Sequence, residues 1–329
     1  MIKINDNSTS LKEVKCNYCN NTAVIQRFHS GEHLCSDCFV KNIEKIIYKT
    51  ISKYKMLKPR DQIIVALSGG KDSISLLYNL IKFQEKNYSA LSLIALSIDE
   101  GIGEYRQNSI KIGSEFCEKY NIKHVIVSFK EKVGKTLDEI VRIKKNNKNY
   151  LYACNYCATL RRRLLNDVAK ELGGDVLALG HNLTDIAETY LMNILFKRIN
   201  LIGNQYLFKS EIRIREENKY YIKKITPLMR IPEEEIRLYV KVKNFDCYSL
   251  QCPYREKEPI LRKRVLNFIQ DCKKYSPEIE FNLLNGFLEF SDLMYHHNKK
   301  KEHNFCQECE YPCASKYCIY CNLIRELKI

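Results

Sequence analysis

The sequence predicts an α/β protein in which a doubly wound parallel sheet lies between two small cysteine-rich modules. In the central part of the chain, short β-branched runs alternate with amphipathic stretches of helical period, as in a parallel sheet with helices on both faces. One of these runs leads directly into a glycine-containing turn and then a helix. Paired cysteines stand near each end of the chain. We therefore expect three units, over residues 1–45, 46–300 and 301–329.

The candidate strands and helices follow one another in the order that such a sheet requires. Each expected strand is a run of β-branched and apolar residues, and each expected helix repeats apolar residues three or four positions apart. The expected strands are 62–67, 93–98, 123–127 and 175–179, and the expected helices are 72–86, 104–120, 155–172, 184–197, 233–243, 258–273 and 277–298.

Two connections lack this regularity. Residues 130–149 are rich in Lys and Asn, so we expect a mobile basic connection with at most one helix, over 136–144. Residues 204–225 alternate polar and apolar side chains around a charged centre. This alternation predicts an antiparallel hairpin that ends at Pro227.

The composition indicates a globular protein with a polyanionic partner. The 329 residues include 54 Lys and Arg against 39 Asp and Glu, which gives a formal charge of +15. Such an excess favours a nucleic acid as partner, although solvated basic faces explain it equally well. No apolar run has the length of a membrane span, and the first residues lack a secretory signal. We therefore expect a cytoplasmic protein that binds no membrane.

Fifteen cysteines in a reducing compartment indicate metal or redox chemistry. Two pairs of Cys-x2-Cys turns have the spacing of tetrahedral zinc sites. The two quartets are Cys16, Cys19, Cys35 and Cys38, and Cys306, Cys309, Cys318 and Cys321. The alternatives are redox-active pairs, or a histidine ligand (His29, His33 or His303) in place of one cysteine. Cys313 lies between the C-terminal turns and is a possible spare ligand.

The turn after the first central strand is a candidate phosphate site. It reads Ser68-Gly69-Gly70-Lys71-Asp72-Ser73, between a buried strand and a helix. Its glycines let backbone N–H groups approach an anion, the helix start adds partial positive charge, and Ser68, Lys71 and Ser73 supply further donors. The spacing differs from that of a Walker loop.

A further constellation combines cysteines with arginines. Cys154 and Cys157 share one face at a helix start and precede three consecutive arginines, 161–163, while Cys252 follows much later in Gln-Cys-Pro-Tyr. We expect the helix dipole and the arginines to lower the pKa of the two thiols. Three cysteines on a [4Fe–4S] cluster would leave one iron open. A third zinc site, a catalytic disulfide pair and buried inert thiols are the alternatives.

A last block follows the fourth expected strand. It reads Gly180-His-Asn-Leu-Thr-Asp185 and stands where open α/β sheets bind ligands, at the carboxyl end of a strand. Asp185 also lies at a helix start, so stabilising that helix is its simplest role.

Taken together, these motifs resemble a known family. The Ser-Gly-Gly-x-Asp-Ser turn resembles the PP-loop of the N-type ATP pyrophosphatases. With the Cys154 pair, Gly-His-Asn-x-x-Asp, Cys-Pro-Tyr and both cysteine modules in this order, the chain resembles the TtuA/NcsA-type tRNA 2-thiouridine synthetases from Cys16 to Cys321.

The resemblance implies a homodimer with two zinc fingers and a [4Fe–4S] cluster on Cys154, Cys157 and Cys252. It also implies that Asp185 is catalytic. The sequence departs from the family at Thr184, where many members have an aspartate. The implied ATP contacts are Ala66, Ser68, Asp72, Ile98, Arg161 and Gly180, beside the phosphate cradle of Gly69, Gly70, Lys71 and Ser73.

These implications combine into one hypothesis. ATP with Mg²⁺ adenylates the C2 oxygen of a tRNA uridine, and a hydrosulfide on the open iron then displaces AMP. The sulfur comes from free sulfide or from the thiocarboxylate of a ubiquitin-like carrier. Lys71 and Arg161 offset phosphate charge, and Asp185 acts as acid or base or orients the groups. Residues 130–148, 161–163 and 255–264 grip the tRNA, and the zinc modules dock it.

Three alternatives remain open. Cys154 or Cys157 would carry a persulfide that Cys252 resolves, without a cluster. The chain would instead be an amide-forming enzyme of the same superfamily, or a non-catalytic zinc-ribbon RNA-binding protein. In the main hypothesis the remaining cysteines are not essential; they are Cys117, Cys247, Cys272 and Cys313.

Overall fold

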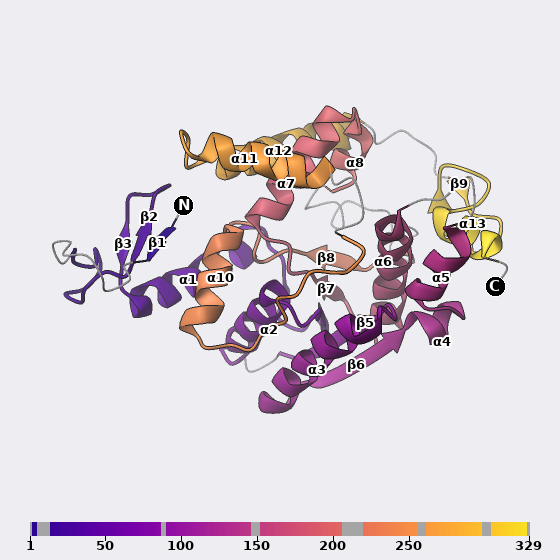
Figure 1. Cartoon of the computed structure of the whole chain (residues 1–329), viewed down its shortest axis with the longest axis horizontal. Coiled ribbons are helices and arrows are strands. Elements are labelled where there is room, and N and C mark those ends of the chain that lie inside the picture. The colour runs from indigo at the N-terminus through magenta and orange to yellow at the C-terminus, as the bar shows by residue number, and fades with distance from the viewer. Residues whose placement is uncertain are drawn as a thin grey trace.

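A five-stranded parallel sheet forms the centre of the molecule, and a cysteine-rich module lies at each end (Figure 1). The computed structural model describes residues 2–4, 14–86, 90–145, 152–205, 220–255, 261–297 and 304–327. The strands are β1 (Ile2–Ile4), β2 (Ile25–Arg27), β3 (His33–Leu34), β4 (Ile63–Ala66), β5 (Ile94–Asp99), β6 (Lys123–Ser128), β7 (Val176–Ala178), β8 (Lys223–Ile225), β9 (Asn304–Phe305) and β10 (Pro312–Cys313). The helices are α1 (Ser36–Lys53), α2 (Lys71–Gln84), α3 (Gly103–Lys119), α4 (Phe129–Val133), α5 (Leu137–Lys144), α6 (Ala153–Glu171), α7 (Leu183–Leu195), α8 (Ile199–Gly203), α10 (Glu233–Val242), α11 (Leu261–Lys273), α12 (Ile279–His297) and α13 (Ile319–Glu326).

The sheet has the doubly wound topology that the sequence predicts. Its strand order is β6-β5-β4-β7-β8, and every neighbouring pair is parallel. Alternate residues of β4 enter different cores: Ile63 and Val65 pack with residues of α1, α2 and α10, whereas Ile64 packs with residues of α5 and α6. Helices therefore cover both faces, and the carboxyl ends of the strands remain at one edge as a place for ligands.

Each cysteine module is a small antiparallel ribbon followed by a helix. In the first, β1, β2 and β3 precede α1; in the second, β9 and β10 precede α13. Cys35 and Cys318 are the N-caps of the two helices, and each sulfur accepts the backbone N–H of the cysteine three residues later. The two ribbons predicted from the spacing lie at opposite ends of the molecule in Figure 1.

Helix α1 was not among the expected elements. Its buried residues Phe39, Ile43, Ile47 and Ile51 repeat every four positions and join the larger core. The helix continues through residue 45, where we expect the first unit to end. The N-terminal ribbon is thus connected to the unit that contains the central sheet by a continuous helix.

The helix expected over 136–144 is confirmed as α5, but the expectation of a mobile connection with at most one helix is wrong for the described part of 130–149. Residues 129–133 and 137–144 form α4 and α5, each of which begins with a capping box, on Ser128 and Thr136 respectively. Their buried side chains include Phe129, Leu137 and Ile140, which belong to the second core. Lysines hide the period of these helices, because Lys130 and Lys132 occupy solvent positions whereas Lys144 occupies a buried one. Residues 146–149 lie outside the described residues.

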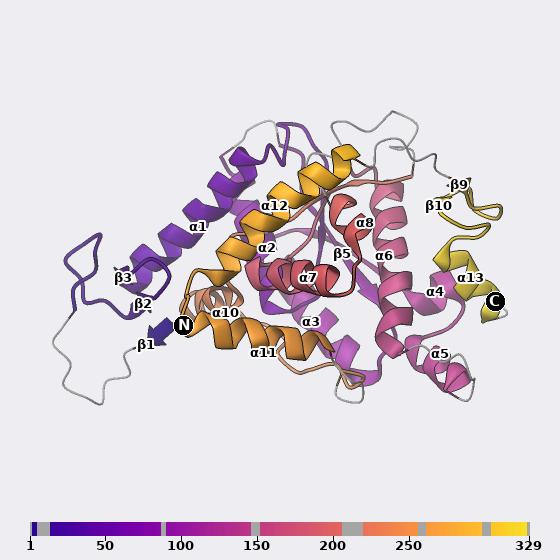
Figure 2. The ribbon, with the colours of Figure 1, turned by 90° about the horizontal axis from the view of Figure 1, so that it is seen from above.

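The expected antiparallel hairpin over 204–225 is wrong at its end. Residues 223–225 form β8, which pairs in parallel with β7 at the edge of the central sheet. Residues 206–219 lie outside the described residues. Helices α11 and α12 then pack on α7, and the pair lies above the sheet in Figure 1 and in front of it in Figure 2. Across the described ranges, no helix combines the length and the apolarity needed to span a membrane.

Candidate active site

The loop between β4 and α2 leaves the start of α2 open to an anion. Gly70 is the N-cap of α2 and makes no side-chain capping bond. Two hydroxyls brace the loop from within: Ser73 Oγ accepts the backbone N–H of Ser68 at 3.1 Å and lies 3.0 Å from Ser68 Oγ. Because the first N–H groups of a helix have no intrahelical partner, this loop fits a phosphate.

Gly69 is the position in this loop that only glycine fills. Its φ is +79°, and a Cβ built there would lie 1.9 Å from the backbone oxygen of Ser109 in α3. The Gly69 carbonyl also accepts the backbone N–H of Tyr248 at 2.9 Å. At Gly70 a Cβ would meet nothing nearer than 3.5 Å. The segment around Tyr248 is therefore attached directly to the phosphate loop.

Two carboxylates hold the Lys71 ammonium. Its Nζ lies 2.8 Å from Asp72 Oδ2 and 2.9 Å from Glu233 Oε1 of α10. Burial alone would lower the pKa of Lys71, but these carboxylates raise it above its ordinary value. Burial raises the pKa of Asp72, against the opposing effect of Lys71. Lys71 is thus a charged side chain that must exchange carboxylates for phosphate when a nucleotide binds.

The block from Gly180 to Asp185 lies against the start of α2. A Cβ at Gly180 would be 3.2 Å from the backbone of Asp72 and Ser73. Asn182 Nδ2 donates to Asp72 Oδ1 at 3.0 Å, and Asn182 and Asp185 form a capping box at the start of α7. Asp185 Oδ1 also lies 3.3 Å from the Arg262 guanidinium. Asp185 therefore stabilises its helix, and its catalytic role stays a prediction.

Arg106 ties together the carboxyl ends of β4 and β5. Its buried guanidinium donates to the backbone oxygens of Ile98 at 2.7 Å and Ser68 at 2.9 Å, and it pairs with Glu100 at 2.7 Å. The other oxygen of Glu100 lies 3.3 Å from Arg161 Nη1. The backbone carbonyl of Ile98, one of the implied ATP contacts, thus already accepts a hydrogen bond from Arg106, while Arg161 reaches the same edge of the sheet.

Cys154, Cys157 and Cys252 gather around this Arg161–Glu100 pair. The charges that act on the Cys157 thiol come from Arg161, Glu100, Cys252 and Cys154, and those acting on Cys252 include Glu100 and Arg161. Cys154 is exposed, and the other two are half-buried. Their sulfurs do not all lie within 4.8 Å of one another, unlike those of the two quartets. The trio is therefore a looser group than either quartet, arranged around one ion pair.

The expectation of a lowered thiol pKa is wrong for Cys157, one of the two cysteines at the start of α6. Burial raises the pKa of Cys157 to about 12 despite the nearby Arg161, and burial raises the pKa of Cys252 as well. Desolvation outweighs the arginine because it penalises the thiolate directly. Without a metal both side chains are thiols, and metal binding must displace their protons.

Cys247 lies in a different environment from Cys252. It packs against the other core, and the charges acting on it are those of Asp246, Asp72 and Lys71. Burial raises its pKa to about 12. Cys247 therefore faces the phosphate loop, which supports Cys252 as the third member of the cysteine trio.

Both cysteine quartets converge on one point each. All four sulfurs of each quartet lie within 4.8 Å of one another. Burial opposes ionisation, but backbone N–H groups lower the pKa of Cys16 and of Cys306 to about 6. His29 instead lies 3.7 Å from a Glu235 oxygen, and the Cys313 thiol donates to the Ser315 carbonyl. Four convergent sulfurs with amide donors fit zinc.

Arg163 connects the C-terminal quartet to the helix that carries Cys154 and Cys157. Its Nη1 donates to Cys309 Sγ at 3.5 Å, and its guanidinium lies over the Tyr311 ring, 4.2 Å from the centroid. Nearby, buried Lys144 of α5 pairs with Glu326 of α13 at 2.9 Å. Arg163 and Lys144, both in ranges expected to contact tRNA, are therefore engaged in contacts within the protein.

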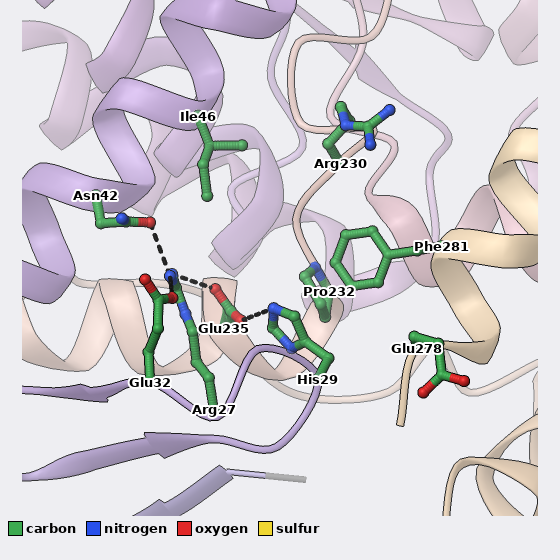
Figure 3. Close-up of a pocket in the computed structure, with 10 residues that line it drawn as sticks. All are labelled: Arg27, His29, Glu32, Asn42, Ile46, Arg230, Pro232, Glu235, Glu278 and Phe281. Carbon is green, nitrogen blue, oxygen red and sulfur yellow. Dashed lines mark hydrogen bonds and ion pairs between the residues drawn. The ribbon is translucent and has the colours of Figure 1, made fainter. Parts of the chain in front are cut away.

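A cavity of about 400 Å³ lies between the N-terminal ribbon, α1, α10 and α12 (Figure 3). Arg27 crosses it and pairs with Glu235 at 2.7 Å, and both side chains are buried. Glu233, Glu234 and Glu235 of α10 follow one another but pair with Lys71, Lys273 and Arg27 respectively. This cavity lies where the N-terminal ribbon packs against the helices of the central unit, and none of the cysteine trio lines it.

The sequence analysis did not single out four residues of this site. Two of them had a signal in the sequence, since Glu100 follows the end of a strand, where ligands bind, and Asn182 stands inside the Gly180 block. Arg106 and Glu233 gave no such signal because their partners lie far away in the sequence. Thr184, the departure from the family, is buried and donates to Glu280 Oε1 at 2.7 Å. It therefore braces α7 against α12.

Comparisons with known proteins agree with this geometry. Residues 39–266 match the family model described as a PP-loop domain. A probable sulfurtransferase of Methanocaldococcus jannaschii is 34% identical over 323 residues, 97% of this chain and 90% of that protein. The cytoplasmic tRNA 2-thiolation protein 1 of Drosophila erecta is 32% identical over 313 residues, 94% of this chain and 86% of that protein.

A solved structure extends the similarity to the whole fold. It is the U34-tRNA thiolase NcsA from Methanococcus maripaludis with its [4Fe–4S] cluster. It has a TM-score of 0.79 and 29% sequence identity, and the match covers 96% of this chain and 97% of that one.

Proposed function

Since this chain belongs to the PP-loop family of tRNA 2-thiolation proteins, we propose that it is a tRNA sulfurtransferase that uses ATP to convert a uridine into 2-thiouridine. The observation that carries the proposal is the convergence of three cysteines and Arg161 beside an open phosphate loop, at one edge of the sheet. The name of the similar NcsA structure suggests the uridine at position 34 as the target.

In the first step the uridine is activated. The C2 oxygen of the base attacks the α-phosphorus of ATP, the α–β phosphoanhydride bond breaks, and pyrophosphate leaves. The open start of α2 binds the phosphates, Lys71 moves from Asp72 and Glu233 to offset their charge, and Arg161 approaches from α6. Asp72 then becomes free to bind Mg²⁺ with the nucleotide.

In the second step sulfur replaces oxygen at C2. A sulfide nucleophile attacks C2, the C2–O bond breaks, and AMP leaves with the former carbonyl oxygen. Cys154, Cys157 and Cys252 would hold a [4Fe–4S] cluster, which with three protein ligands leaves one iron available to an external sulfur ligand. Asp185 lies close enough to Asp72 for its negative charge to raise the pKa of Asp72. This proximity supports a role for Asp185 in orienting the reacting groups or in taking a proton.

The partners follow from the same chemistry. They are tRNA and a sulfur donor, which is either free sulfide or the thiocarboxylate of a ubiquitin-like carrier. The protein works as a homodimer in the cytoplasm. Zinc in the two quartets keeps the terminal modules folded. Arg161 and Arg162 remain exposed on α6, where they can contact the RNA backbone.

Metal analysis of protein purified without oxygen tests the proposal. We expect about four irons and two zincs per chain in the wild type, loss of iron alone in Cys252→Ala, and unchanged iron in Cys247→Ser. The wild type should then form 2-thiouridine, AMP and pyrophosphate from tRNA, ATP and sulfide. A chain that contains zinc but no iron and still thiolates tRNA with sulfide would show that the reaction needs no cluster.

A further inference from the structure

A cavity of about 450 Å³ lies beside the segment that carries Cys252. None of its residues is among the predicted catalytic, ATP-binding or metal-binding residues, although Asp138, Val141 and Arg142 lie in the range 130–148 that is expected to contact tRNA. Its walls come from the start of α3, from α5 and from the two residues after Cys252; they are Ile102, Gly103, Glu104, Tyr105, Asp138, Val141, Arg142, Pro253 and Tyr254. The cavity therefore adjoins the cysteine trio without including it.

Aromatic rings concentrate around this opening. Tyr105 is half-buried, and its ring centroid lies 5.4 Å from that of Tyr248, whose backbone N–H is bonded to the phosphate loop at Gly69. The Tyr254 hydroxyl donates to Asp138, which fixes the second ring. Such rings are the usual platform for an unstacked base of RNA.

The charges around the cavity select against phosphate. Helix α3 starts here, but Asp138 Oδ2 already accepts the backbone N–H of Gly103 at 3.2 Å, and Glu104 stands in the first turn. Two carboxylates at a helix start repel a phosphate and accept hydrogen bonds from N–H or O–H groups. The cavity thus fits the neutral part of a nucleotide, and exposed Arg142 is available on the rim for the backbone.

We propose that this cavity receives the target uridine of the tRNA, unstacked from its loop, with the base against the rings of Tyr105 and Tyr254. The inference rests on the proposed function, because it takes tRNA as the substrate. It adds the binding site of the base. Tyr105 lies between the proposed base site and the ATP site, since it lines the cavity and its ring also contacts Tyr248, which is bonded to the phosphate loop.

The test compares tRNA affinity of the full-length holoenzyme for two RNAs, one with uridine and one with an abasic nucleotide at position 34. For the uridine RNA, we expect Tyr105→Leu to weaken affinity by about 5- to 150-fold, the range of one lost base–aromatic stack. Tyr105→Phe, which keeps the ring, should stay within about 2-fold, as should Tyr275→Leu at a fully exposed tyrosine. Iron content and ATP affinity should not change.

The abasic RNA makes the assignment specific. Wild-type protein should discriminate between the two RNAs, whereas Tyr105→Leu should bind both equally. Glu104→Trp, at an exposed rim position, fills the mouth of the cavity without disturbing the core and should lose the same discrimination. Equal discrimination in wild type and Tyr105→Leu would overturn the proposal. A wild type that binds tRNA but forms no 2-thiouridine would instead overturn the proposed function.

Discussion

At the scale of single residues, the phosphate loop offers a direct comparison between two adjacent glycines. Gly69→Ala places a Cβ against the Ser109 carbonyl and forces an L-residue into positive φ, which by itself costs about 1–2 kcal/mol. We expect this variant to lose ATP binding and to unfold at a lower temperature. Gly70→Ala, whose Cβ has room, should keep the stability of the wild type. Thermal unfolding with and without a non-hydrolysable ATP analogue measures both; equal unfolding temperatures would contradict the steric argument.

Glu233 sets how readily Lys71 reaches phosphate. Replacing Glu233 by Gln removes one of the two carboxylates that hold the ammonium and one negative charge near a polyanionic ligand. We expect ATP affinity to rise by about 1.5- to 5-fold, on the order of one partly exposed ion pair. Arg237→Gln, which removes the solvent-side partner of Glu233, is the control and should leave ATP affinity unchanged. Isothermal titration with ATP decides; weaker binding in Glu233→Gln would show that Glu233 positions Lys71 productively.

At the scale of elements, Arg163 links α6 to the C-terminal quartet. Arg163→Met removes the donor to Cys309 and the contact with the Tyr311 ring. Because outer partners of metal ligands tune affinity by about 10- to 100-fold, one of the two zincs should be released to a chelator far sooner. Arg162→Met, at the neighbouring exposed position, should release zinc as the wild type does. A colorimetric zinc-release assay shows whether one metal or neither is affected.

The same scale shows which elements a sequence can reveal. The strands β4, β5 and β7 were predictable because burial on both faces leaves continuous apolar runs, as in Ile63–Ala66. Strand β8 has only three residues, two of them lysines, so its parallel pairing had no local signal. The phosphate loop and both quartets were predictable because their ligands are close in sequence. Arg106 and Glu233 act across long separations, and only the folded chain reveals their partners.

At the scale of the whole molecule, a buried ion pair joins the N-terminal ribbon to the catalytic unit. Arg27→Met leaves the buried Glu235 carboxylate without its partner, and we expect a loss of about 3–5 kcal/mol. Replacing both residues, as Arg27→Met with Glu235→Leu, should recover most of that loss because no uncompensated charge remains. Urea unfolding compares the variants. A double variant no more stable than Arg27→Met would show that the ribbon needs the charge pair itself.

The start of α10 determines how long the connection before it can be. Adjacent helix positions point about 100° apart, so Glu233, Glu234 and Glu235 face three different neighbours. One inserted or deleted residue in the short segment between β8 and α10 would rotate all three side chains away from their partners together. The phosphate loop, the α11–α12 pair and the N-terminal ribbon would then lose their ion pairs with α10 together. The number of residues in this short connection is therefore as much a part of the site as any side chain that it orients.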